Sequence, residues 1–278
     1  MPSQSLFSPR PYLAHSLLAS VHGLRSISTS MYKTHRCHKK EFLLKFAKDR
    51  QRWLYWLFEA RKRYGLCVLN YVVTSNHIHL LVKDTGESVI PKSLQLIAGR
   101  TAQEFNQRKG RKGAYWEDRY HATAVGSDEH LFKCLVYIDL NMVRAGVVRH
   151  PAEWMQGGYH EIQSPPQRYR IIDISVLMEL SGVDTLADLQ QQRAQWVAHE
   201  LAVGGTQRVA SWTESIAVGS ESFTNKVSAS LGIKALHRTT VEQDDKFVIK
   251  ENQEPYTSLF NAKTDHPSLE NTYQWDVL

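Results

Sequence analysis

The segment Cys67–Lys83 constrains the fold more than any other part of the chain. Residues 67–74 (CVLNYVVT) are rich in β-branched side chains, and a second such run, HIHLLVK, occupies residues 77–83. The turn dipeptide Ser75-Asn76 separates the two runs. Two strand-forming runs joined so tightly predict a β-hairpin. The fold must therefore contain an antiparallel pair of strands.

The segments around this hairpin alternate between strand and helix patterns. We expect a first strand at 31–36, helices at 49–64, 91–108 and 127–145, and a further strand at 119–125. Asp49 and Ser127 are expected N-caps, whereas Gly65 and Gly146 are expected to end their helices. The order β-α-β-β-α-β-α predicts an α+β fold. It is a ferredoxin-like β-α-β-β-α-β core with an antiparallel sheet and one appended helix.

The core is expected to span residues 31–150. Residues 1–30 contain no Asp or Glu and many Ser, which indicates a leader without ordered structure, with either Met1 or Met31 as the start. Residues 151–241 are expected to form a helical and irregular C-terminal extension, with helices near 173–182, 185–201 and 213–231. Residues 242–278 are polar and non-periodic, which is typical of a poorly ordered tail.

Charge is divided unevenly along the chain. Residues 1–150 carry 24 Lys and Arg against 11 Asp and Glu, whereas residues 151–278 carry 10 against 17. A basic front half favours contact with a polyanion, although a merely solvated basic surface is an equal alternative from charge alone. Nucleic acid is the partner that this pattern predicts.

Other compositional features indicate where the protein works. The three cysteines, Cys37, Cys67 and Cys134, are too few and too scattered for a disulfide framework, which fits a reducing compartment. No run of 18 apolar residues occurs, so no membrane contact is expected. We therefore expect a cytoplasmic protein.

His77 and His79 form the clearest candidate metal site. Residues i and i+2 of a strand point to the same face, so both imidazoles can reach one divalent ion. A bare His-x-His is nevertheless more often two histidines on a half-buried strand, without a metal.

Tyr137 and Asn141 add a second signal. They are four residues apart in the helix expected at 127–145, so they share one helix face. A tyrosine hydroxyl beside a metal-bound phosphate is a competent nucleophile, and an Asn amide oxygen can be a hard metal ligand. The alternative is that Tyr137 is a packing aromatic among Leu135, Ile138 and Leu140.

Three motifs together resemble the IS200-like (Y1, HUH-type) transposase family, and within it the REP-associated tyrosine transposases of bacteria. They are NHIHLLV (76–82), RKGRKGAYWEDRY (108–120) and YIDLNMVRAG (137–146). The resemblance covers about 31–148. It implies a ferredoxin-like nuclease that cleaves single-stranded DNA at the foot of a hairpin, leaving a 5′-phosphotyrosine bond and a free 3′-OH.

The resemblance also implies roles for individual residues. Tyr137 corresponds to the nucleophile, and His77, His79 and Asn141 correspond to the ligands of a divalent metal, Mg²⁺ or Mn²⁺. Met142 departs from the family, in which many members have proline after the Asn; no functional group is lost. The implied protein is a monomer or homodimer that acts on DNA in the bacterial nucleoid.

The run Arg108–Tyr120 interleaves basic and aromatic residues, as expected of a surface that binds unpaired DNA. Trp116 is equally well explained as a core residue. Tyr120 and, less well, Tyr115 are rival nucleophiles. The expected DNA-binding residues are Arg108, Lys109, Arg111, Lys112, Trp116, Arg119, Tyr120 and Arg144.

Two other functions remain open from the residues. A non-catalytic nucleic-acid-binding protein on the same fold would use neither the histidines nor Tyr137 chemically. A metal-dependent phosphohydrolase would cut DNA without a protein–DNA bond. Both leave the spacing of Tyr137 and Asn141 unexplained.

Overall fold

The computed structural model describes residues 29–251, except 87, 118–119, 127–128, 206, 233–234, 236–237 and 244–245. The leader expected at 1–30 therefore lies almost wholly outside the described residues, as does the tail from 252 onwards. Within the described part of the chain, no helix is both long and apolar enough to cross a membrane.

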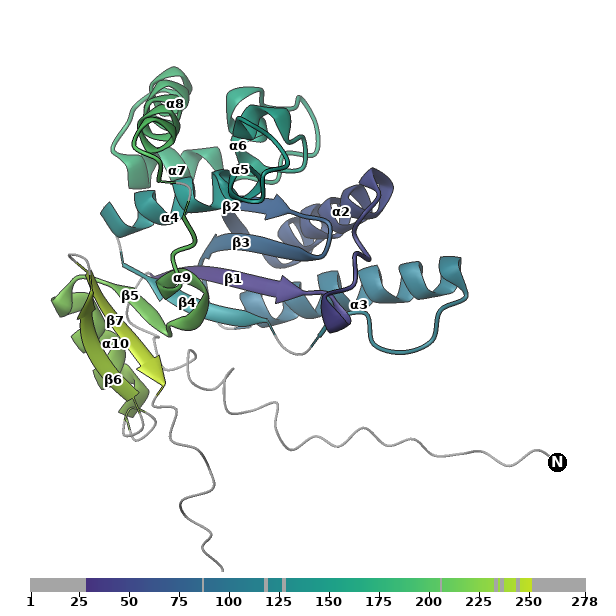
Figure 1. Cartoon of the computed structure of the whole chain (residues 1–278), viewed down its shortest axis with the longest axis horizontal. Coiled ribbons are helices and arrows are strands. Elements are labelled where there is room, and N and C mark those ends of the chain that lie inside the picture. The colour runs from purple at the N-terminus through teal and green to yellow at the C-terminus, as the bar shows by residue number, and fades with distance from the viewer. Residues whose placement is uncertain are drawn as a thin grey trace, which may run out of the picture.

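The predicted ferredoxin-like order is confirmed (Figure 1). Its elements are β1 (Ser30–Arg36), α2 (Ala47–Tyr64), β2 (Cys67–Val73), β3 (His77–Lys83), α3 (Val89–Lys109), β4 (His121–Val125) and α4 (Glu129–Asp139). The four strands lie in the order β2-β3-β1-β4, and each neighbouring pair is antiparallel. Helices α2 and α3 pack together. They lie on one face of the sheet, and α4 lies against the other (Figure 1).

The hairpin forms where the sequence predicts it. The Thr74 hydroxyl accepts hydrogen bonds from the backbone N–H groups of Asn76 and His77, and the Thr74 N–H donates to the His77 carbonyl. These bonds close the turn between β2 and β3. They fix the β2–β3 register, in which His79 lies opposite Val72.

The start of α2 differs from the prediction. Phe46 occupies the N-cap, so Asp49 is not the cap and lies in the first turn. Asp49 is buried and forms an ion pair with Arg108 from the end of α3. The distant cation therefore explains this aspartate better than local capping does. Gly65 ends the helix in the left-handed conformation, with φ 71°, as expected of a glycine there.

The third predicted helix is divided in two. Helix α4 ends at Asp139, and a short helix, α5 (Asn141–Arg144), follows after Leu140. Gly146, with φ 67°, follows its end as expected. Ser127, the expected cap, lies outside the described residues. Leu140, at the break, has a ψ of 4°, outside the helical range.

The C-terminal extension is more ordered than the sequence indicates. Its helices and 3₁₀ turn are η2 (Pro151–Glu153), α6 (Gly158–Gln163), α7 (Ile174–Ser181), α8 (Leu186–Ala202), α9 (Ser211–Glu214) and α10 (Glu221–Leu231). Three strands, β5 (Ala217–Gly219), β6 (Arg238–Gln243) and β7 (Lys246–Glu251), extend the sheet to seven strands in the order β2-β3-β1-β4-β5-β7-β6. Strand β5 is parallel to β4.

These strands correct two expectations. The extension is not only helical and irregular, and the segment after residue 242 begins with a strand rather than a disordered tail. Val248 and Ile249 of β7 are buried, at 0% and 2% exposure. Strand β7 pairs with both β5 and β6, so tertiary contacts rather than a local pattern order this segment.

The extension is fixed to α4 through a buried ion pair. Arg193 of α8 donates to Asp139, and Asn70 of β2 donates to the other oxygen of that carboxylate at 2.8 Å. Neither side chain of the ion pair has any solvent exposure. The extension therefore holds the end of α4, the helix that carries Tyr137, against the sheet.

Candidate metal and nucleophile site

The two histidines of β3 lie side by side on the face that carries α4. Their ring centroids are 4.8 Å apart, with the ring planes at 75°. The alternation of a strand places both on one face, as predicted. His79 is buried, whereas His77 is partly exposed at the start of the strand.

Hydrogen bonds orient both rings in the same way. His77 Nδ1 lies 2.7 Å from Asn76 Oδ1, and His79 Nδ1 contacts the Tyr32 hydroxyl. A ligating histidine uses one ring nitrogen for the metal and the other for such a partner. With each Nδ1 engaged, the Nε2 atom of each ring is the one that can bind a cation.

The protonation state of the pair suits metal binding. Burial, with Arg36 as a lesser cause, lowers the pKa of His77 to about 4. Burial, followed by the neighbouring His77, lowers the pKa of His79 well below its usual value. Both imidazoles are therefore neutral at pH 7, the form that donates a lone pair to a metal.

Asn141 completes the set of possible ligands. Its side-chain nitrogen lies 2.8 Å from His79 Nε2. Two ligand atoms on one octahedral ion at about 2.1 Å would lie about 3 Å apart, so this spacing fits a shared cation. A half-turn of the amide about its terminal bond would present Oδ1 instead. Among the described residues, no group of three His, Cys, Asp or Glu side chains could hold a metal.

Tyr137 lies one aromatic ring away from His79. The Tyr32 ring stacks on His79 at 5.7 Å and meets the Tyr137 ring edge-on at 6.3 Å. Burial raises the pKa of the Tyr137 hydroxyl, and Arg144 and Arg208 act against that rise. The phenol is therefore protonated at neutral pH, and it needs nearby cations to react as a phenolate.

Arg144 belongs to this site. Its guanidinium carbon lies 3.9 Å from the centre of the Tyr137 ring, and it donates a hydrogen bond to the Tyr137 carbonyl. That carbonyl is at the break between α4 and α5, and the sequence alone did not show the break. Arg144 was expected to contact DNA; the structure places it beside the candidate nucleophile.

The rival tyrosines lie elsewhere. Lys33 of β1 points to the face opposite Tyr32, and its ammonium lies 5.0 Å from the centre of the Tyr120 ring. Tyr115 is buried and packs against Trp116 at 4.8 Å. Neither ring packs against His77 or His79. The geometry therefore favours Tyr137.

The expected DNA-binding run is held partly by internal contacts. Arg108 pairs with Asp49, and Arg111 pairs with Glu41 at 3.2 Å. Trp116 stacks on His35 at 4.2 Å, and its indole N–H donates to the Ala98 carbonyl.

These contacts explain Trp116 as a packing residue of the core. Lys109 lies 5.8 Å from the centre of the Phe46 ring, and both Lys109 and Lys112 are exposed. Arg119 lies outside the described residues.

The sequence did not indicate two groups near the site. Tyr32 is a core residue by pattern, yet it links His79 to Tyr137. Lys39 and Lys40 are exposed in the 3₁₀ turn η1 (His38–Lys40). The Lys40 carbonyl accepts a hydrogen bond from Asn76, the neighbour of His77. These lysines therefore add positive charge at the end of the sheet where β3 begins.

The chain is similar to several known proteins. Residues 26–141 match the family described as "Transposase IS200 like". A solved structure described as a "REP associates tyrosine transposase bound to a REP hairpin" is 17% identical, covering 50% of this chain and 81% of its own, with a TM-score of 0.40. A second, described as a transposase from Deinococcus radiodurans R1, is 15% identical over 51% of this chain and 98% of its own, with a TM-score of 0.31. No curated protein sequence matches the chain.

Proposed function

We propose that the chain nicks and rejoins single-stranded DNA through a covalent bond to Tyr137, because residues 26–141 match the IS200-like transposase family. One observation carries the proposal. His79 contacts His77, the Asn141 amide and Tyr32, and the Tyr32 ring in turn meets the Tyr137 ring.

His77, His79 and Asn141 would hold a divalent cation, Mg²⁺ or Mn²⁺. When bound, such an ion neutralises charge on the scissile phosphate and lowers the barrier to attack. The engagement of each Nδ1 atom by another partner and the 2.8 Å contact of His79 Nε2 with Asn141 support this assignment.

Tyr137 supplies the nucleophile. Its hydroxyl loses a proton to solvent, and its oxygen forms a bond to phosphorus while the bond to the 3′-oxygen breaks. The leaving 3′-oxygen takes up a proton and becomes a free 3′-OH, and the 5′-phosphate stays on the tyrosine. Arg144, beside the ring, is placed to stabilise the phenolate and the developing phosphate charge.

The reverse reaction explains rejoining. A 3′-OH from a second DNA end attacks the phosphotyrosine and releases Tyr137. The phosphotyrosine bond conserves the energy of the broken phosphodiester, so that joining needs no ATP. This is the chemistry of transposition. We propose a hairpin or other single-stranded DNA as the substrate because the front half of the chain is basic, and the nucleoid as the place of action. The protein acts as a monomer or homodimer.

The test is a labelling experiment on the whole protein. A hairpin with a single-stranded flank, labelled downstream of the cut, is incubated with protein and Mn²⁺ and separated under denaturing conditions. We expect label to migrate with the protein. Cleavage without attached label would indicate a phosphohydrolase, and binding without cleavage would indicate a DNA-binding protein.

A further inference from the structure

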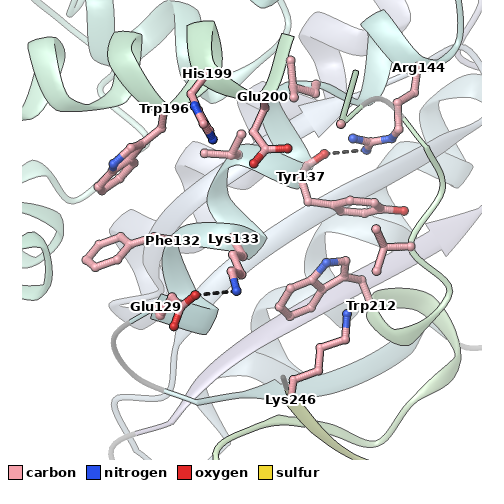
Figure 2. A pocket seen from close by; sticks show the side chains of 14 residues that line it. Glu129, Phe132, Lys133, Tyr137, Arg144, Trp196, His199, Glu200, Trp212 and Lys246 are labelled. Carbon is pink, nitrogen blue, oxygen red and sulfur yellow. Dashed lines mark hydrogen bonds and ion pairs between the residues drawn. The ribbon is translucent and has the colours of Figure 1, made fainter. Parts of the chain in front are cut away.

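A pocket of about 370 Å³ lies between α4 and the C-terminal extension (Figure 2). Tyr137 and Arg144 form its wall on the side of the candidate site. Trp196 and Glu200 of α8, together with Trp212 of α9, form the opposite side. The volume falls within the range of about 300–1,000 Å³ that is typical of small-ligand pockets.

The extension supplies one side of this pocket, beyond the residues that match the family, whereas α4 on the other side lies within them. The matched segment stops at residue 141, whereas α8, α9 and β7 all follow it. The family resemblance assigns roles to the histidines and to Tyr137, but it does not say what this pocket binds.

The walls of the pocket suit a nucleotide. Trp212 is buried against Tyr137, with ring centroids 6.3 Å apart, whereas Trp196 and Phe132 are partly exposed and meet at 4.7 Å. Unpaired bases stack on such aromatic faces. Lys133, Arg144 and Lys246 also line the pocket, and cations of this kind attract phosphate.

Polar groups can read the edge of a base. Figure 2 shows the Glu200 carboxylate directed into the space between Lys133 and Tyr137. An ionised carboxylate only accepts hydrogen bonds, so it would receive one from a base N–H. Glu129, the other acidic residue of the lining, is already paired with Lys133.

We propose that this pocket holds the unpaired nucleotide next to the scissile phosphate, with its base against the partly exposed Trp196 and its phosphate toward Arg144. The proposal rests on the proposed function, because Tyr137 on the pocket wall defines which phosphate is attacked. The extension thus selects which unpaired nucleotide lies at the cut.

Equilibrium binding without metal tests this separately from cleavage. Hairpins with a single-stranded flank, each carrying one abasic position, are titrated with wild-type protein in EDTA and followed by fluorescence anisotropy. We expect one abasic position to weaken binding about five-fold or more, since stacking of one base contributes about 1–3 kcal/mol. The Trp196→Leu variant should lose a similar factor on intact DNA and little more on that one abasic hairpin.

Two further variants provide a second test of the pocket and a control outside it. Val209→Trp places a large ring in the pocket from a partly exposed loop position, so it should block the nucleotide even if Trp196→Leu fails to fold. Tyr55→Leu, an exposed aromatic of α2 outside the pocket, should change nothing.

The outcomes separate the two proposals. Equal losses on every hairpin, or no loss in either pocket variant, would overturn the pocket assignment even if wild-type protein forms the DNA adduct. A loss confined to one position in a protein that forms no adduct would keep the pocket and reject the phosphotyrosine chemistry.

Discussion

The hydroxyl of Tyr32 offers a precise test of how the metal ligands are oriented. Tyr32 and His79 are buried at 0% and 4% exposure, and the hydroxyl contacts His79 Nδ1. Tyr32→Phe keeps the ring stacking at 5.7 Å on His79 but removes that partner. With a cation on Nε2, the Nδ1–H must donate to the Tyr32 oxygen, so the substitution leaves a buried donor unpaired.

Two magnitudes follow from this geometry. Leaving one buried polar group unsatisfied costs about 1–3 kcal/mol of folding stability. Losing the partner of a ligating histidine lowers metal affinity about ten- to hundred-fold. We therefore expect a lower midpoint in urea and a higher Mn²⁺ concentration for half-maximal adduct formation, with the rate at saturating Mn²⁺ largely restored.

The control is Tyr120→Phe, because Tyr120 lies on the opposite face of the sheet with Lys33. It should leave the Mn²⁺ requirement unchanged. An unchanged Mn²⁺ requirement in Tyr32→Phe, together with the expected loss of stability, would show that His79 does not bind the cation through Nε2.

Three further substitutions test the site and the fold. Replacing His77 and His79 together by Ala should abolish adduct formation while leaving DNA affinity nearly intact, because phosphate contacts dominate affinity; adducts formed at the wild-type rate would remove the metal site. Arg193→Met should destabilise the protein by about 3–5 kcal/mol because it leaves the buried Asp139 carboxylate without its cation, and a thermal melt within a degree of wild type would contradict this. Burial lowers the pKa of Lys33 from 10.5 to about 7, so the unfolded chain binds more protons between these values and stability rises with pH across that window. Lys33→Met should remove this pH dependence and raise stability near pH 7, by up to about 5 kcal/mol at about 1.4 kcal/mol per pKa unit; urea unfolding at pH 7 and pH 9 measures both effects.

Local patterns were sufficient for the core. The β-branched runs on either side of Ser75-Asn76 and the glycines at 65 and 146 depend on neighbours in the chain, and each lies where the structure has the corresponding turn or helix end. The strand period also placed His77 and His79 together without any knowledge of the fold.

Features that depend on distant contacts were not predictable in this way. Asp49 follows a capping pattern in sequence, but Arg108 from another helix engages it. Asp139, at the end of α4, is paired with Arg193, a residue 54 positions away along the chain. An arginine in a helix such as α8 is expected to be solvated, so nothing local indicates that it is fully buried.

The same reason explains what was missed beside the nucleophile. Strand β7 is short, and only its pairing with β5 and β6 orders it. The break between α4 and α5 directs Arg144 back onto Tyr137, which the spacing of an unbroken helix does not show. Trp212 reaches Tyr137 from a four-residue helix.

Mapping the site of covalent attachment tests the central claim most directly. Protein incubated with hairpin DNA and Mn²⁺ is digested with nuclease and protease, and the peptide that retains a nucleotide is sequenced by mass spectrometry. We predict attachment at Tyr137 in wild type and none in Tyr137→Phe. The free energy of unfolding of this variant should fall by only about 1 kcal/mol, because it loses one hydroxyl. Attachment at Tyr120 or Tyr115, or an adduct that persists in Tyr137→Phe, would contradict the assignment.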